Sequence, residues 1–239
     1  MPASAYRRPD IQSRVKVWDV PTRLFHWSLA LCILAACISA ELGGDQALRL
    51  HFRSGYAVLI LVVFRMLWGF AGPRYARFGQ FVRSPAATVR YARALLRGTQ
   101  EPSYAGRPGH NPLGAVSVLA LLAICAVQAA SGLFSSDAIA SEGPLARFVS
   151  EAAVKRCTAL HAWGETILYA LVAAHLLAIA FYRFAKGENL LTPMLTGTKS
   201  VGGISTDAAV DATDDPATRA RALLLLALST AFIAFLVTL

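Results

Sequence analysis

Residues 160–184, LHAWGETILYALVAAHLLAIAFYRF, form an apolar stretch that carries two histidines, His161 and His175. The stretch is long enough to cross a bilayer as a helix. The histidines stand fourteen positions apart, which in a helix means roughly 21 Å along the axis and about 40° between their directions. Both rings are therefore expected on one face, one towards each leaflet. Two stacked prosthetic groups would need one axial ligand at each of these depths.

Each of these histidines has a second interpretation when it is taken alone. A histidine inside the membrane can instead hydrogen-bond to a neighbouring helix, because polar side chains often join membrane helices. The choice depends on whether the rest of the chain supplies partner histidines at the same two depths.

The composition indicates an integral membrane protein. Of the 239 residues, 56% are hydrophobic and 15% are charged, and the mean hydropathy is +0.50. The net charge of +9 comes from Lys and Arg beside apolar runs, without aromatic-interleaved stripes, so no nucleic-acid partner is expected. The cysteines lack the C-x-x-C-H arrangement of covalent haem and the paired spacing of a zinc site, so any haem would be held by coordination and packing alone. They are Cys32, Cys37, Cys125 and Cys157.

The first apolar run, residues 24–40, follows Pro21 and carries His26 near its start. Residues 1–19 before it are polar and basic, and we expect them to form a cytoplasmic arm. A cleaved signal peptide is the alternative, although the basic region is long for one. Cleavage would remove His26 and with it one of the candidate ligands.

The second apolar run, residues 48–70, follows a short loop, so it is expected to lie antiparallel to the first. His51 then lies near the side opposite to His26. Arg65 is fourteen positions after His51 and returns to the cytoplasmic end of the same face, while Arg53 stays at the outer end. Each arginine is a candidate partner for a haem propionate. The alternative is that both extend to the lipid headgroups.

The loop over residues 71–111 is rich in arginine and almost free of acids, which indicates a cytoplasmic location. Within it, Ser84 and Pro85 suit the start of an amphipathic helix that ends near Arg97. We expect this helix to lie on membrane lipid, with docking of an acidic soluble partner as the alternative.

The third apolar run, residues 112–134, is preceded by His110. We interpret His110 as a capping or headgroup-level residue, with a quinone site beside His110 and Arg107 as the alternative. The outer loop over residues 135–158 balances acids against bases, as a non-cytoplasmic segment would.

The C-terminal part adds two segments to the four-helix domain of residues 20–187. Residues 188–218, rich in Gly, Ser, Thr, Ala and Asp towards their end, are expected to form a flexible linker. Residues 219–239 are just long enough for a fifth span. This span carries no histidine and no acid, so we assign it to anchoring or partner contact.

The predicted topology sorts the four intramembrane histidines into two pairs. His26 and His175 are expected on the cytoplasmic side, and His51 and His161 on the outer side. Each pair could hold one iron inside a four-helix bundle, where such bundles build cofactor sites. Ligation by two histidines leaves no open iron position, so the chemistry implied is outer-sphere electron transfer.

Two glycines suit the close approach of a flat macrocycle to the helices. Gly55 lies one turn after His51, and Gly164 lies nearly one turn after His161. Glycines also serve ordinary helix packing. Glu165, four residues after His161, is the main acid within the spans, and we interpret it as a group that supports a ligand or a helix pair.

Four motifs in order resemble the bacterial cytochrome b561 family, which includes the b-type subunits of nickel-iron hydrogenases. The resemblance implies four helices that bind two b-type haems through His26, His51, His161 and His175, and electron exchange with the quinone pool. The acidic linker and fifth apolar segment depart from the family pattern, which leaves the partner open. The motifs are PTRLFHW (21–27), H-x-x-x-G (51–55) with RMLWGFAGPRYARF (65–78), GHNPLGA (109–115) and LHAWGETILYALVAAH (160–175).

We therefore predict an all-α integral membrane protein, a four-helix haem-binding bundle with a fifth C-terminal transmembrane helix. It is expected in the bacterial inner membrane, multi-pass, with a cytoplasmic N-terminus and two haem b groups. The expected function is electron relay between a quinone and a redox partner, either a c-type cytochrome or a dehydrogenase or hydrogenase subunit. The alternatives are a haem-free membrane anchor or assembly subunit, and a histidine-based metal or proton transporter, which the scarcity of intramembrane acids disfavours.

Overall fold

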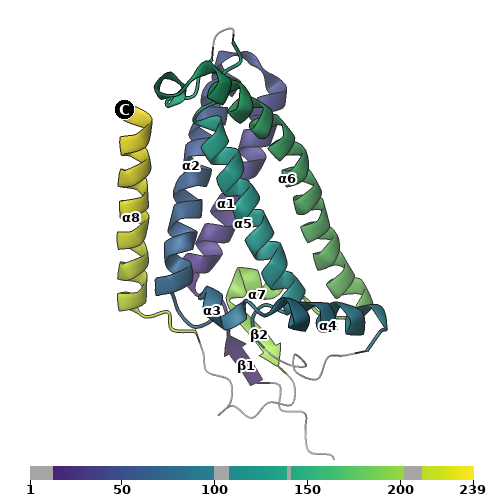
Figure 1. Ribbon diagram of the computed structural model, residues 1–239. Helices are drawn as coiled ribbons and strands as arrows, with labels where there is room; N and C mark the ends of the chain where they lie inside the picture. Colours follow the sequence, from purple (N-terminus) through teal and green to yellow (C-terminus); the bar gives the residue numbers. More distant parts are fainter. Residues whose placement is uncertain (1–12, 100–107, 139–140, 202–211) are drawn as a thin grey trace, which may run out of the picture.

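The computed structural model describes residues 13–99, 108–138, 141–201 and 212–239, and it is built almost entirely of helices (Figure 1). Five helices in these ranges are long and apolar enough to cross a membrane. The prediction of a helical bundle with a fifth C-terminal span is confirmed. These helices are α1 (Val20–Leu42), α2 (Gly44–Ala71), α5 (Pro112–Gly132), α6 (Glu151–Ala185) and α8 (Pro216–Thr238).

Side-chain caps fix where four of the spanning helices begin. In each case a side-chain oxygen accepts a hydrogen bond from the backbone N–H three positions later, which satisfies a donor that the helix leaves free. In three of them a proline follows within the first two helical positions, where its missing N–H costs nothing. The capping residues are Asp19 for α1, Asn111 for α5, Ser150 for α6 and Asp215 for α8.

The helices pack as an antiparallel bundle with one helix added outside it (Figure 1). Helix α1 packs mainly on α2 and α5 mainly on α6, while α2 also contacts α5. The turn between α1 and α2 runs through Gly43 and Gly44 at φ 66° and 82°, backbone angles that favour glycine. Helix α8 lies along α2, against which it buries Ala222 and Ile233 among its side chains.

Short elements close one end of the bundle, which we call the basic end. They are α3 (Phe78–Phe81), α4 (Pro85–Leu96), α7 (Leu191–Thr196) and a two-stranded antiparallel sheet of β1 (Ser13–Lys16) and β2 (Thr198–Val201). The opposite end, which we call the loop end, carries the connection from α5 to α6 with the 3-10 turn η1 (Ala146–Phe148). The amphipathic helix predicted after Ser84 is present as α4, and Ser84 caps it.

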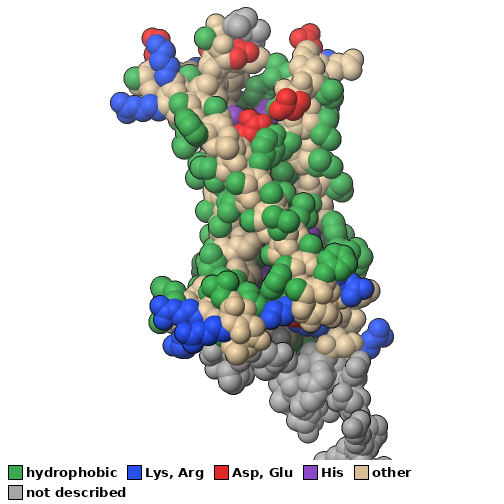
Figure 2. Space-filling model, turned by 90° about the vertical axis from the view of Figure 1, so that its right-hand side faces the viewer, with side chains coloured by type: hydrophobic (Ala, Val, Ile, Leu, Met, Phe, Trp, Pro, Cys, Tyr) green, Lys and Arg blue, Asp and Glu red, His purple; other side chains and the backbone are tan. Residues whose placement is uncertain are grey.

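Charged side chains gather at the two ends of the molecule. Figure 2 shows Lys and Arg at the basic end, a band of hydrophobic side chains in the middle, and acids among further bases at the loop end. Large apolar side chains in the band are exposed, for example Trp163 and Leu177 at 70% each. Exposed apolar side chains around five spanning helices fit a multi-pass membrane protein.

The structure differs from the sequence-based prediction in two places. Helix α6 begins at Glu151 and not near residue 160, because the Ser150 side chain caps it there. The polar residues before the apolar run form its first turns. The expected flexible linker over residues 188–218 contains α7 and β2, and β2 pairs with β1 from the expected N-terminal arm. Such pairing over a long sequence separation leaves no local pattern in either segment.

Candidate cofactor site

The four intramembrane histidines meet in two pairs, as the predicted topology requires. His26 on α1 and His175 on α6 have ring centroids 6.4 Å apart, with 50° between the ring planes. His51 on α2 and His161 on α6 have centroids 6.1 Å apart, with 82° between the planes. We call these the basic-end pair and the loop-end pair.

The spacing within each pair fits two imidazoles that share one metal ion. Metal–nitrogen bonds of about 2 Å, with about 1.1 Å from each nitrogen to its ring centre, put the two centroids about 6.2 Å apart. Both observed separations, 6.4 and 6.1 Å, lie close to this value. Aromatic rings in direct contact span the same range of centroid distances, so the pairing of four histidines from three helices at two depths adds the specificity that the distance alone does not give.

Both histidines of the loop-end pair are held by backbone carbonyls of neighbouring helices. His51 Nδ1 lies 2.9 Å from the carbonyl oxygen of Ala36 on α1, and His161 Nδ1 lies 2.9 Å from that of Gln128 on α5. A carbonyl can only accept, so each Nδ1 carries the proton and each Nε2 keeps its lone pair. This is the arrangement in which imidazole binds a metal, because the second hydrogen bond fixes the ring and raises its basicity.

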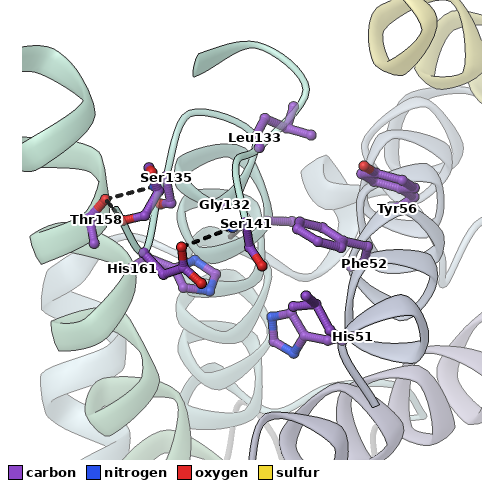
Figure 3. A pocket seen from close by; sticks show the side chains of 15 residues that line it. His51, Phe52, Tyr56, Gly132, Leu133, Ser135, Ser141, Thr158 and His161 are labelled. Atoms are coloured by element: carbon purple, nitrogen blue, oxygen red, sulfur yellow. Dashed lines mark hydrogen bonds between the residues drawn. The ribbon is translucent and has the colours of Figure 1, made fainter. Parts of the chain in front are cut away.

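A hollow of about 260 Å³ opens between the loop-end histidines, towards the connection from α5 to α6. Figure 3 shows His51 and His161 on opposite sides of it, with Phe52 and Tyr56 on the α2 side. Gly55 also lines the hollow, and a Cβ added there would meet no atom within 4 Å. Gly55 thus leaves space where the sequence predicted the approach of a macrocycle.

Two other glycines next to His161 serve different purposes. A Cβ at Gly132 on α5 would lie 3.1 Å from the His161 ring, so Gly132 makes room for that imidazole. The sequence reasoning missed Gly132, whose only signal is a small residue near the end of α5. A Cβ at Gly164 would overlap the Gln128 side chain, so Gly164 allows α5 and α6 to pack closely. It does not provide the open space that was considered for it.

The basic-end pair lacks the carbonyl anchors of the loop-end pair. His26 Nδ1 is buried and has no hydrogen-bond partner among the residues that the structure describes. The His26 ring packs edge-on against Trp27, with 5.0 Å between centroids. The two sites therefore share their spacing but differ in how the protein holds the rings.

The two arginines considered for propionates lie in different surroundings. Arg65 is 3% exposed, donates through Nη2 to the Ala76 carbonyl oxygen at 3.0 Å, and packs over the Phe78 ring. Its Nη1 is buried without a hydrogen-bond partner in the described part of the chain, so an anion would find a donor there. Arg53 is exposed and does not line the hollow, which agrees with the alternative that it extends to the headgroups.

His110 is half-buried among aromatic side chains at the basic end. Its ring packs against Trp18 and Phe81, with centroids 4.7 and 4.8 Å away. Its Nδ1 is buried, and none of the described residues forms a hydrogen bond with it. Burial, followed by the charge of Arg65, lowers the pKa of His110 to about 3, so the ring is neutral. Arg107, grouped with His110 in the sequence, lies outside the described residues.

The Ser131 hydroxyl on α5 lies 3.4 Å from His161 Nδ1. Glu165 accepts a hydrogen bond of 2.7 Å from the Tyr169 hydroxyl of its own helix. Within the residues that the structure describes, no group of three or more His, Cys, Asp or Glu side chains could hold a metal ion. The four cysteines are free and partly or fully buried.

Five spanning helices with histidines paired at two levels between them fit the architecture of a multi-pass membrane cytochrome of the b type. Sequence comparison identifies the particular family. Residues 17–197 match the family described as prokaryotic cytochrome b561, and the chain belongs to that family. No curated protein and no solved structure matches the chain. The family resemblance predicted from the four motifs is confirmed, and the protein is a transmembrane b-type cytochrome that binds haem b.

Proposed function

We propose that this cytochrome carries two haem b groups and relays electrons across the membrane between a quinone and a second redox protein. The observation that carries the proposal is the spacing of the two histidine pairs, 6.4 Å for His26 and His175 and 6.1 Å for His51 and His161. In this scheme each pair binds one haem iron from opposite faces. Two haems supply one-electron carriers at two depths, separated by roughly 21 Å along α6.

The chain contributes orientation and burial to this relay. The Ala36 and Gln128 carbonyls hold the His51 and His161 rings in one tautomer, so that each Nε2 keeps the lone pair that an iron ion would need. Two protein ligands per iron leave no position for oxygen, which favours electron transfer over oxygen chemistry. Gly55 leaves the flat space that a macrocycle would need beside His51.

The proposed partners follow from the surroundings of the two sites. A quinone is expected because its apolar tail reaches a membrane cytochrome through the lipid that contacts the exposed apolar band. The second partner is a c-type cytochrome or a dehydrogenase or hydrogenase subunit, as family resemblance suggests. The excess of Lys and Arg at the basic end supports a bacterial inner-membrane location with the basic end and N-terminus in the cytoplasm (Figure 2).

The test is a reduced-minus-oxidised visible spectrum with pyridine haemochrome quantitation on the detergent-purified protein. We expect two b-type haems per chain, with His161→Ala losing the loop-end haem and His175→Ala losing the basic-end haem. Thr166→Ala, an exposed position on the same helix, is the matched control and is expected to keep both haems. A folded preparation without haem would contradict the proposal and favour the haem-free anchor.

A further inference from the structure

We propose that Arg65 and His110 together form the seat for a propionate of the basic-end haem. The inference rests on the proposed function, since it requires a haem between His26 and His175. It adds His110, which the histidine pairs do not use, as a hydrogen-bond donor to the carboxylate.

The first observation is that Arg65 is a buried cation with an unused donor. Its side chain is 3% exposed, and its Nη1 atom has no hydrogen-bond partner within residues 13–99, 108–138, 141–201 and 212–239. A buried guanidinium is stable when an anion or another acceptor satisfies its donors, because an unpaired buried charge is costly. The position therefore calls for an acceptor with a negative charge.

Asp19 is the nearby acid, and its oxygens are already occupied. Its Oδ1 accepts hydrogen bonds from the Thr22 backbone N–H at 2.8 Å and from Trp68 Nε1 at 3.2 Å. Its Oδ2 accepts from the Thr22 hydroxyl at 2.8 Å. No ion pair between Asp19 and Arg65 occurs within 4 Å among the described residues. Asp19 contributes charge at a distance, and the free Nη1 of Arg65 is left for another group.

The second observation is that His110 has an unused nitrogen, Nδ1, at the other end of a row of aromatic rings that begins beside Arg65. Arg65 packs over Phe78, Phe78 packs on Phe81 with centroids 5.8 Å apart, and Phe81 packs on His110. The Nδ1 of His110 is buried without a partner. Because the ring is neutral, one nitrogen carries a proton, and Nδ1–H would donate to a carboxylate at little desolvation cost.

The depth of these groups agrees with the basic-end pair. His26 stands six residues after the first residue of α1, and Arg65 stands six residues before the last residue of α2. Because α1 and α2 share the turn at Gly43 and α2 has 28 residues against 23 in α1, Arg65 lies roughly 7 Å nearer the basic end than His26. His110 precedes α5 by two residues, so it lies between the height of His26 and the end of the bundle. A haem held at His26 would extend its propionates into this region.

A propionate fits this site better than a quinone headgroup does. A quinone is neutral and would leave the Arg65 charge without a close counter-ion, whereas a carboxylate supplies both the acceptor and the charge. The ring of His110 is also enclosed by Trp18 and Phe81, which suits a fixed ligand. The earlier alternative of a quinone site at His110 thus becomes an outcome of the test.

The test uses Arg65→Gln, His110→Phe and His110→Gln in the full-length, haem-loaded protein. Phe keeps a ring between Trp18 and Phe81 but cannot donate, while Gln supplies an N–H that can replace Nδ1–H. Arg53→Gln is the matched control, an exposed arginine on the same helix. The readouts are the midpoint potential of each haem and redox-difference infrared spectra of protein that carries haem ¹³C-labelled at the propionate carboxylates.

We expect Arg65→Gln to lower the midpoint potential of the basic-end haem by at least about 59 mV. For one electron this is a tenfold change in the reduction equilibrium constant. Removing a cation favours the oxidised haem, which carries one more positive charge. His110→Phe is expected to shift the ¹³C-sensitive carboxylate band, and His110→Gln to restore it. The loop-end haem should keep its content and potential in every variant, which also reports that the protein is folded.

Two results would overturn the inference and leave the proposed function standing. One is two haems per chain with the basic-end potential and the labelled band unchanged in both Arg65→Gln and His110→Phe. The other is an unchanged band in His110→Phe together with a several-fold loss of quinone-dependent oxidation, which would assign His110 to quinone. Absence of haem from the wild-type protein would instead overturn the proposed function itself.

Discussion

The Nδ1 atom of His161 lies 2.9 Å from the carbonyl oxygen of Gln128, so the imidazole is oriented by a helix other than its own. His51 is held in the same way by the Ala36 carbonyl oxygen, whereas no described residue forms a hydrogen bond with His26 Nδ1. A backbone acceptor cannot be lost by mutation of its side chain. The loop-end pair is therefore the more rigidly oriented of the two pairs, and the difference has consequences for the haems that we propose.

The loop-end haem is expected to have the lower reduction potential. Hydrogen bonds from Nδ1–H to carbonyls make His51 and His161 more electron-rich ligands, which stabilises ferric iron. The buried Arg65 charge near the basic-end pair acts in the opposite direction on the other haem. We expect a separation of at least about 59 mV, a tenfold difference for one electron. A redox titration of wild-type protein, assigned with His161→Ala and His175→Ala, measures it. A lower potential at the basic end would contradict the argument.

Gly132→Leu is expected to remove the loop-end haem and keep the basic-end haem. A Cβ at this position would already lie 3.1 Å from the His161 ring, and a branched side chain must displace the imidazole from its place. Pyridine haemochrome analysis should give about one haem per chain in place of two. Gly79→Leu is the control, because a Cβ at Gly79 meets no atom within 4 Å. Retention of both haems in Gly132→Leu would show that His161 is not a ligand.

Gly55→Leu tests whether the open space beside His51 belongs to a macrocycle. No atom lies within 4 Å of a Cβ at this position, so the protein itself tolerates a larger side chain. Replacing a helical glycine should even stabilise α2 by up to about 1 kcal/mol. We expect Gly55→Leu to at least match wild type in yield and in thermal stability when both are haem-free. In the haem-loaded preparation we expect the variant to lack the loop-end haem. Gly55→Ala provides the graded control, and full haem loading of the leucine variant would place the macrocycle elsewhere.

The start of α8 is expected to loosen in Asp214→Asn. The Asp214 side chain is 1% exposed and pairs with Lys16 at 2.9 Å and with Arg219 at 3.0 Å. Both partners are partly exposed, so the loss should be about 1 kcal/mol, equivalent to roughly fivefold faster hydrogen–deuterium exchange over residues 216–222. Asp45→Asn, an exposed acid of α2, is the control and should leave this exchange unchanged.

The same contact predicts a pH dependence for α8. Burial alone would raise the pKa of Asp214, but hydrogen bonds from Arg219 and Lys16 outweigh it and hold the pKa below its usual value. A lowered pKa in the folded state stabilises the contact above the ordinary aspartate pKa of 3.8, and the stabilisation is lost as the pH falls below it. Exchange over residues 216–222, corrected for the intrinsic rate, should therefore rise on acidification in wild type. The rise should be smaller in Asp214→Asn, with a remainder from Asp215, whose pKa is also lowered by its bonds with Thr218. An equal rise in both proteins would exclude Asp214 as the cause.

The sequence by itself determined the number of spans, their approximate limits and the sorting of four histidines into two levels. These features follow from local properties: apolar length, capping residues such as Asn111, and the fixed rise of a helix. The short connection at Gly43 made α1 and α2 antiparallel, and this sufficed to predict which histidines would meet. The same local reasoning predicted too late a start for α6. The first turns of this helix, residues 151–159, are partly polar, so the cap at Ser150 and not hydropathy fixes where it begins.

Only the tertiary structure decided what surrounds each histidine. The carbonyl acceptors of Ala36 and Gln128, the clearance at Gly132 and the enclosure of His110 depend on the rotation of each helix against its neighbours. Hydropathy leaves that rotation unspecified, because lipid and protein interior are both apolar. The pairing of β1 with β2 is likewise a contact between segments far apart in the chain. The depth of a residue in the membrane follows from its own segment, whereas the environment of a ligand depends on how several segments pack together.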